Sequence, residues 1–208
     1  MYNKLIVFLL LFYATNTFGQ ISFGITGGVN RNDVIVTNAP FLPTSLYRPN
    51  TGYHLGVFTR IQLSKFSFNP ELLFVQRGCN SSTYLFGSIL QPISDTRINL
   101  NYIELPLLFT FFSAKWFSIE AGPNASMKLS AKEISDNGKK DVSDWFNKPY
   151  DFGINGGIRA SLGSKISIVG RYYHGLRSIL QFPNISPNTF PSSSSKTFQL
   201  SLHYLLRE

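Results

Sequence analysis

Apolar and polar residues alternate one by one along several stretches of this 208-residue chain. From Phe117 to Leu129 every second residue is apolar, and the residues between them are polar, charged or glycine. Side chains of a β-strand point alternately to the two faces of a sheet, so this pattern predicts a strand with one apolar and one polar face. The same alternation returns in 53–63, 150–162 and 198–207.

The number and spacing of such segments predict an all-β fold, an eight-stranded antiparallel up-and-down transmembrane β-barrel. The expected strands are 21–30, 52–63, 66–78, 98–112, 115–130, 150–162, 165–177 and 196–207. Their connections alternate between long loops (31–51, 79–97, 131–149, 178–195) and short turns (64–65, 113–114, 163–164). Long loops at one end, short turns at the other and an even strand count are typical of barrels in bacterial outer membranes.

The polar faces of these segments carry charges of both signs. A soluble barrel of the lipocalin type would instead turn its apolar face inward around a ligand. Eight strands leave an interior just wide enough for side chains, so we expect opposite charges to pack together there. The expected lumen network comprises Arg60, Glu71, Glu104, Glu120, Lys128, Arg159 and Arg171, with Arg77 as a further candidate. The glycines expected to relieve crowding inside the barrel are Gly24, Gly28, Gly122, Gly153 and Gly157.

Aromatic residues are expected to form two bands on the outer wall. Near the short turns lie Phe66, Phe68, Phe111, Phe112, Trp116, Phe117 and Tyr204. Toward the long loops lie Tyr53, Tyr102, Tyr150, Phe152, Tyr172 and Phe198. Two such girdles are expected where a barrel crosses both membrane interfaces, and a soluble barrel has no reason for them.

Two features depart from a regular membrane strand. Pro70 and Pro106 each remove a ladder hydrogen bond, and a closed barrel has no free edge for them; a β-bulge near the short-turn end would accommodate them. The third segment is also apolar on both faces around residues 72–75.

The N-terminus has the layout of a secretory signal peptide. Lys4 precedes an apolar run over 5–13, and small residues near Gly19 suggest cleavage before Gln20, which leaves 20–208 as one outer-membrane barrel domain. A membrane anchor is the alternative, but the run is about half of what a bilayer requires.

Little in the composition predicts catalysis or nucleic-acid binding. The net charge of +8 is spread over many segments, and one cysteine, Cys79, excludes a disulfide framework or a zinc cluster. His54, His174 and His203 fall on three strands without a nucleophile elbow or metal spacing, so we expect no enzyme, no cofactor and no metal. The carboxylates could do acid–base work or line an ion path, but a structural network that neutralises buried charge is favoured.

Several short motifs together resemble the PorT-like outer-membrane β-barrel family of Bacteroidota. They are Gly27-Gly28-Val29-Asn30, Gly52-Tyr53-His54-Leu55-Gly56, Pro70-Glu71-Leu72-Leu73-Phe74 through Gly78, Asn101-Tyr102-Ile103-Glu104-Leu105-Pro106, Glu120-Ala121-Gly122-Pro123, and Gly170-Arg171-Tyr172-Tyr173 with Gly175-Leu176. The resemblance covers the mature chain and implies an eight-stranded barrel in the outer membrane. PorT is associated with protein secretion, but barrel motifs alone do not carry that role over.

The favoured interpretation is therefore a non-enzymatic envelope scaffold or binding protein, with a place in a secretion or surface assembly as one option. A narrow channel for small solutes and an outer-membrane enzyme are the alternatives. Expected partners are outer-membrane lipid and, through the loops 31–51, 79–97, 131–149 and 178–195, other envelope or secretion-system proteins, because loops on a rigid scaffold usually carry recognition. Nucleic acid is not expected as a partner.

Overall fold

The computed structural model describes residues 21–37, 47–63, 66–84, 92–114, 116–135, 138–143, 149–177 and 192–207. These ranges contain the strands β1 (Ile21–Thr37), β2 (Tyr47–Leu63), β3 (Phe66–Tyr84), β4 (Pro92–Ser113), β5 (Phe117–Ser135), β6 (Gly138–Asp141), β7 (Tyr150–Ser161), β8 (Ile166–Gly175) and β9 (Ser192–Arg207). The expected signal peptide over residues 1–19 lies outside the described part of the chain. No helix in the described ranges is both long and apolar enough to span a bilayer.

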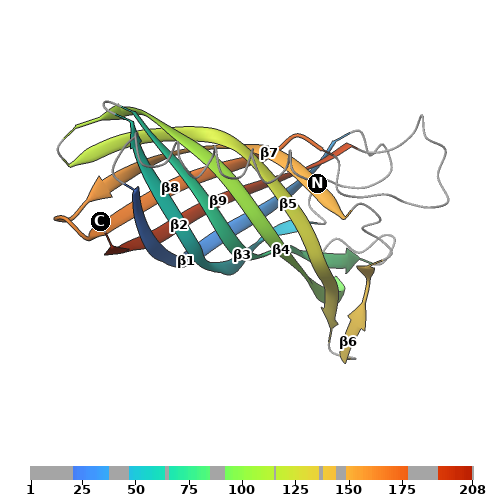
Figure 1. Ribbon diagram of the computed structural model, residues 1–208. Coiled ribbons are helices and arrows are strands. Elements are labelled where there is room, and N and C mark those ends of the chain that lie inside the picture. Colours follow the sequence, from blue (N-terminus) through green and yellow to red (C-terminus); the bar gives the residue numbers. More distant parts are fainter. Residues whose placement is uncertain are drawn as a thin grey trace, which may run out of the picture.

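Eight of the strands close into an antiparallel barrel, as predicted (Figure 1). Each of the strands β1 to β4 pairs with the next one, β5 pairs with β7, β7 pairs with β8, and β9 pairs with both β8 and β1. The short β6 stands outside this closed ring and extends the sheet from the end of β5. Figure 1 shows this β5–β6 extension bending away from the barrel.

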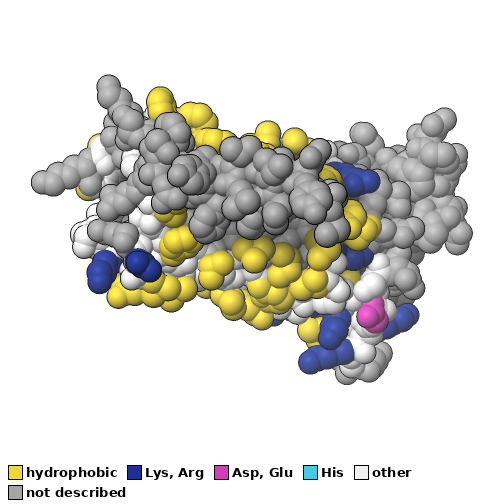
Figure 2. All heavy atoms as spheres, in the orientation of Figure 1, with side chains coloured by type: hydrophobic (Ala, Val, Ile, Leu, Met, Phe, Trp, Pro, Cys, Tyr) yellow, Lys and Arg dark blue, Asp and Glu magenta, His cyan; other side chains and the backbone are white. Residues whose placement is uncertain are grey.

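The outer wall is apolar and the inner wall is largely polar, as the alternation predicts. On β9, Phe198, Leu200 and Leu202 are exposed, whereas Gln199, Ser201 and His203 are buried. No strand of the described ranges covers the outer face, so this exposed apolar surface is what a lipid-facing wall requires. Figure 2 shows hydrophobic side chains, in yellow, on the visible parts of the wall between the two ends of the molecule, and Lys and Arg side chains toward both ends.

Both aromatic bands are present on this wall, with one correction. At the turn end Phe66, Phe111 and Trp116 are exposed, and at the loop end Tyr53, Tyr150, Tyr172 and Phe198 are exposed. Tyr102, which was expected in the loop-end band, is instead 4% exposed and faces the lumen. Side chains two residues apart on a strand point to the same face, which we call strand parity, and Tyr102 lies two residues from the inward-facing Glu104.

Several strands continue into the segments that were expected to be loops. β1 and β9 pair as far as Thr37↔Ser192, and β3 and β4 pair as far as Tyr84↔Pro92. The expected loops 31–51, 79–97, 131–149 and 178–195 therefore begin or end as strand. The alternation fades in these extensions because no lipid selects an apolar face there, while backbone pairing continues.

The strands accommodate the two prolines without a bulge at either position. Pairing of β3 with β4 passes from Pro70↔Leu107 to Leu73↔Glu104 without a change of register. Pro106 lies opposite Asn124 in an unshifted stretch of the β4–β5 ladder, and register shifts occur instead between Asn101 and Tyr102 and between Thr110 and Phe112. Each proline therefore interrupts the hydrogen bonding locally but leaves the register unchanged.

Candidate functional site: the ion-paired lumen

A first layer of ion pairs crosses the lumen toward the turn end. Both terminal nitrogens of Arg171 donate to Glu71, each at 2.9 Å, and Nη2 also donates to Glu120 at 2.6 Å. Arg159 donates to the other oxygen of Glu120 at 2.8 Å, and its Nη1 lies 3.1 Å from Nδ1 of His203. Two guanidiniums thus face two carboxylates from four different strands, so this layer is electrically neutral.

A glycine makes the central contact of this layer sterically feasible. Glu120 on β5, Gly157 on β7 and Arg171 on β8 lie opposite one another in register. A Cβ added at Gly157 would lie 2.6 Å from the Gly170 carbonyl oxygen and 3.1 Å from the Arg171 Cα. The absence of a side chain on β7 therefore leaves room for Arg171 to reach across to Glu120.

A second layer lies further along the lumen toward the loop end. Arg77 contacts Glu104 at 2.6 Å and Asp151 at 3.2 Å, and the Tyr173 hydroxyl donates to the same Asp151 oxygen at 2.7 Å. The Arg77 guanidinium lies 3.9 Å from the ring centroid of Tyr173 and 5.2 Å from that of Tyr102. This Arg is thus held by two carboxylates and by the faces of two aromatic rings.

Buried apolar side chains surround the two layers. Leu73 and Val75 lie between Glu71 and Arg77 along β3, and both are almost completely buried. Their inward orientation explains why the third predicted strand is apolar on both faces. Further buried apolar residues come from other strands: Phe58, Leu108 and Val169. The lumen is therefore packed with side chains over its central part.

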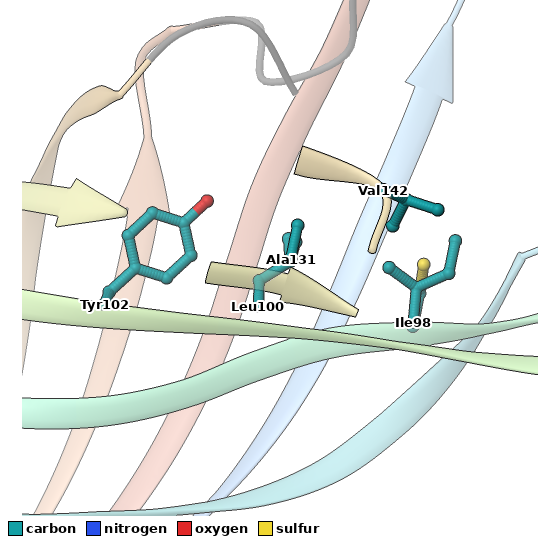
Figure 3. Packing of buried hydrophobic residues seen from close by; sticks show 6 residues of the cluster. Ile98, Leu100, Tyr102, Ala131 and Val142 are labelled. Carbon is teal, nitrogen blue, oxygen red and sulfur yellow. The ribbon is translucent and has the colours of Figure 1, made fainter. Parts of the chain in front are cut away.

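The two ends of the lumen differ. At the turn end Arg60 and Arg159 line a small polar cavity of about 70 Å³, together with Ser67 and Thr110. At the loop end an apolar cluster brings together the inner faces of β3, β4 and β5 and Val142, the residue that follows β6 (Figure 3). Its members are Cys79, Ile98, Leu100, Tyr102, Ala131 and Val142.

The structure brings together some of the predicted network residues and separates others. Glu71, Glu120, Arg159 and Arg171 form the first layer, and Glu104 joins the second layer with Arg77. Arg60 lies at the turn end beside the cavity, and the Lys128 ammonium donates to the Ser143 carbonyl at the loop end. Arg60 and Lys128 thus lie at opposite ends of the lumen.

Three participants in the second layer were missed: Asp151, Tyr173 and Tyr102. Strand parity could have identified Asp151, because the alternation over 150–162 already placed it on the polar face. Tyr173 shares a face with Arg171 and could have been found in the same way. The cation–π contacts of Arg77, in contrast, depend on the staggering of strands that are distant in sequence.

The arrangement favours charge neutralisation over chemistry. Each carboxylate of the two layers already accepts a hydrogen bond or ion pair from an arginine, and all of them are buried. His54 Nε2 lies 2.7 Å from the Ser201 hydroxyl oxygen, but both residues are buried within the wall. Within the described ranges, no three His, Cys, Asp or Glu side chains are arranged to hold a metal ion.

A matching family model and a similar solved structure support the barrel fold. A family model described as the outer membrane protein β-barrel domain matches residues 14–181. Neisserial surface protein A is 11% identical over 89% of this chain and 98% of its own, with a TM-score of 0.50. Ail, the attachment invasion locus protein of Yersinia pestis, is 13% identical over 90% of this chain and 99% of its own, with a TM-score of 0.48. OprG from Pseudomonas aeruginosa is 11% identical over 92% and 98%, with a TM-score of 0.45. No curated protein matches.

Proposed function

Because this chain belongs to the outer membrane protein β-barrel domain family, we propose that it is a non-enzymatic scaffold or binding protein of the cell envelope. Its family and fold place it in the outer membrane. The observation that carries the proposal is the filled lumen, in which two ion-paired layers and apolar side chains occupy the space that a channel needs. A barrel closed in this way offers its outer wall and its loop-end surface for function.

The length of the strands supports a role at the loop end. A membrane-spanning strand needs about 9–11 residues, whereas β4 has 22 residues and β3 and β5 have 19 each. Since the turns at the other end are short, much of this excess stands outside the membrane on the loop side. The barrel therefore carries a sheet-supported surface beyond the lipid, as expected of a binding platform.

Membership of a secretion or surface assembly is part of the same proposal, supported by the resemblance to PorT-like proteins. Cross-linking in native membranes followed by copurification of the tagged chain tests it. The cross-linked partners of the wild type are compared with those of two variants, in which residues 136–149 or 178–191 are replaced by short linkers. We expect defined envelope partners with the wild type and their loss with at least one variant. An unchanged set of cross-linked proteins in both variants would count against a loop-mediated role.

A further inference from the structure

The outward face of the barrel changes from apolar to basic at its loop-side edge. On β1 the exposed Val29 is followed on the same face by Arg31, and on β9 Phe198 is preceded on that face by Lys196. On β5 the outward position after Leu129 is Lys132, because the register shift places Ala131 on the inner face. Three strands thus place a cation at the first outward position beyond the lipid-facing wall.

Further cations surround this edge. Arg97 on β4 and Arg177 after β8 are exposed, and β6 carries Lys139 and Lys140 on the extension that bends away from the barrel (Figures 1 and 2). The described hydrogen bonds of Arg97 go to neutral groups, the Asn99 side chain and the Thr51 carbonyl. These interactions position the guanidinium without neutralising its charge.

Carboxylates compensate for only part of this charge. Asp33 lies opposite Lys196, Asp141 lies opposite Lys132, and Glu133 lies opposite Lys140. The cations named on these strands are Arg31, Arg97, Lys132, Lys139, Lys140, Arg177 and Lys196. Seven cations against these three carboxylates leave an excess of four positive charges. We call this set the basic rim.

From this arrangement we infer that the basic rim binds the phosphate groups of anionic lipids in the surrounding leaflet. The rim begins where the aromatic residues of the loop-end band mark the membrane interface, which is the depth of lipid headgroups. Basic residues at that depth attract anionic lipid by about 1 kcal/mol each, and several act together on one lipid annulus. Arginine adds bidentate geometry that fits a phosphate. The inference concerns lipid selection and does not depend on the proposed scaffold role.

The test measures which lipids stay bound to the folded mature chain. The refolded barrel, in a zwitterionic detergent, is mixed with equal amounts of phosphatidic acid and phosphatidylcholine, and retained lipids are counted by native mass spectrometry. We expect phosphatidic acid to dominate the bound population and the preference to fall as salt is raised, because exposed charges are screened. Equal retention of the two lipids by the wild type would overturn the inference.

A pair of matched double variants locates the site. Arg31→Gln/Lys132→Gln removes two rim cations, and Lys165→Gln/Arg207→Gln removes two exposed cations at the turn end. The first should weaken phosphatidic acid binding roughly tenfold to thirtyfold and the second less than about twofold. Equal losses in both variants would contradict a rim site.

A third variant tests the rim with substitutions that should not affect the folding of the barrel wall. Lys139→Gln/Lys140→Gln lies on β6, outside the closed barrel, so it should leave heat-modifiable gel mobility intact. It should lower the phosphatidic acid preference by at least threefold. Full retention of the preference in this variant would limit lipid binding to the barrel wall and overturn the inference for the rim as a whole.

Discussion

Arg171 connects the first lumen layer, since it contacts both Glu71 and Glu120. We predict that Arg171→Met lowers the free energy of unfolding by about 3–5 kcal/mol, because two buried carboxylates then lose their shared cation. The measurement is a urea titration of the refolded barrel, followed by heat-modifiable gel mobility. The exposed Arg207→Met is the control and should change stability by less than about 0.5 kcal/mol.

The same layer allows a compensating test. Combining Arg171→Met with Glu71→Gln removes one buried cation and one buried carboxylate and keeps the ion pair between Glu120 and Arg159, so it should recover most of the lost stability. If the double variant is as unstable as Arg171→Met alone, charge pairing is not what Arg171 contributes.

Gly157 permits the contact between Arg171 and Glu120, whereas its neighbour Gly156 faces open space. We predict that Gly157→Ala costs about 1–3 kcal/mol of unfolding free energy through close contacts with β8. Gly156→Ala, on the same strand, should be neutral or slightly stabilising. Equal urea midpoints for the two variants would show that the lumen can expand at this point.

The inward orientation of the network residues follows from strand parity. Glu71, Glu120, Arg159 and Arg171 share the polar faces of amphipathic strands, and lipid on the opposite face enforces that pattern. Parity does not decide which charged residues meet, because partners such as Glu71 and Arg171 lie 100 residues apart and depend on strand stagger. Tyr102 was misplaced because its type suggested an interface, although its parity with Glu104 indicates the lumen.

At the scale of the element, the outer face of β9 must match lipid. Leu202 lies in the middle of the apolar stretch of β9, and Leu206 lies near its turn-side end. We predict that Leu202→Arg costs about 2–4 kcal/mol of unfolding free energy in lipid vesicles and that Leu206→Arg costs about 0–1 kcal/mol. Equal costs, measured by urea titration in vesicles, would mean that depth along β9 does not set the polarity of its surroundings.

The strand β6 was not expected, because its four residues Gly138–Asp141 are polar or glycine and show no alternation. The adjacent Val142 anchors it, since this residue is 2% exposed and its amide donates to the Ala131 carbonyl. Backbone pairing and one buried side chain define this element, and neither leaves a periodic signal in the sequence.

We predict that Val142→Ser releases β6 while the barrel stays folded. Hydrogen exchange should then accelerate at least tenfold in Lys132–Ser135, the residues that pair with β6, and remain unchanged in β7 and β8. Lys140→Ser, on the exposed surface of β6, is the control and should leave exchange near the wild-type rate. Unchanged protection in Val142→Ser would show that backbone pairing alone holds β6.

At the scale of the whole molecule, the barrel has an apolar outer wall, a filled lumen and a loop side that extends beyond the lipid. The wall places the protein in the membrane, and the extended side offers surface for partners. The observed strands on this side are longer than the sequence predicted. The alternation of apolar and polar residues ends where the lipid ends, whereas hydrogen bonding between the strands continues.

The central claim is that the barrel's own side chains close its lumen. Single-channel recording of the refolded wild type in planar bilayers with 1 M KCl tests it most directly. A variant with Arg77, Glu104, Arg171, Glu71 and Glu120 all replaced by alanine serves as the opened reference. We predict no conductance steps above the bare bilayer for the wild type and measurable steps for the reference. Stable, ohmic steps from the folded wild type would contradict the account.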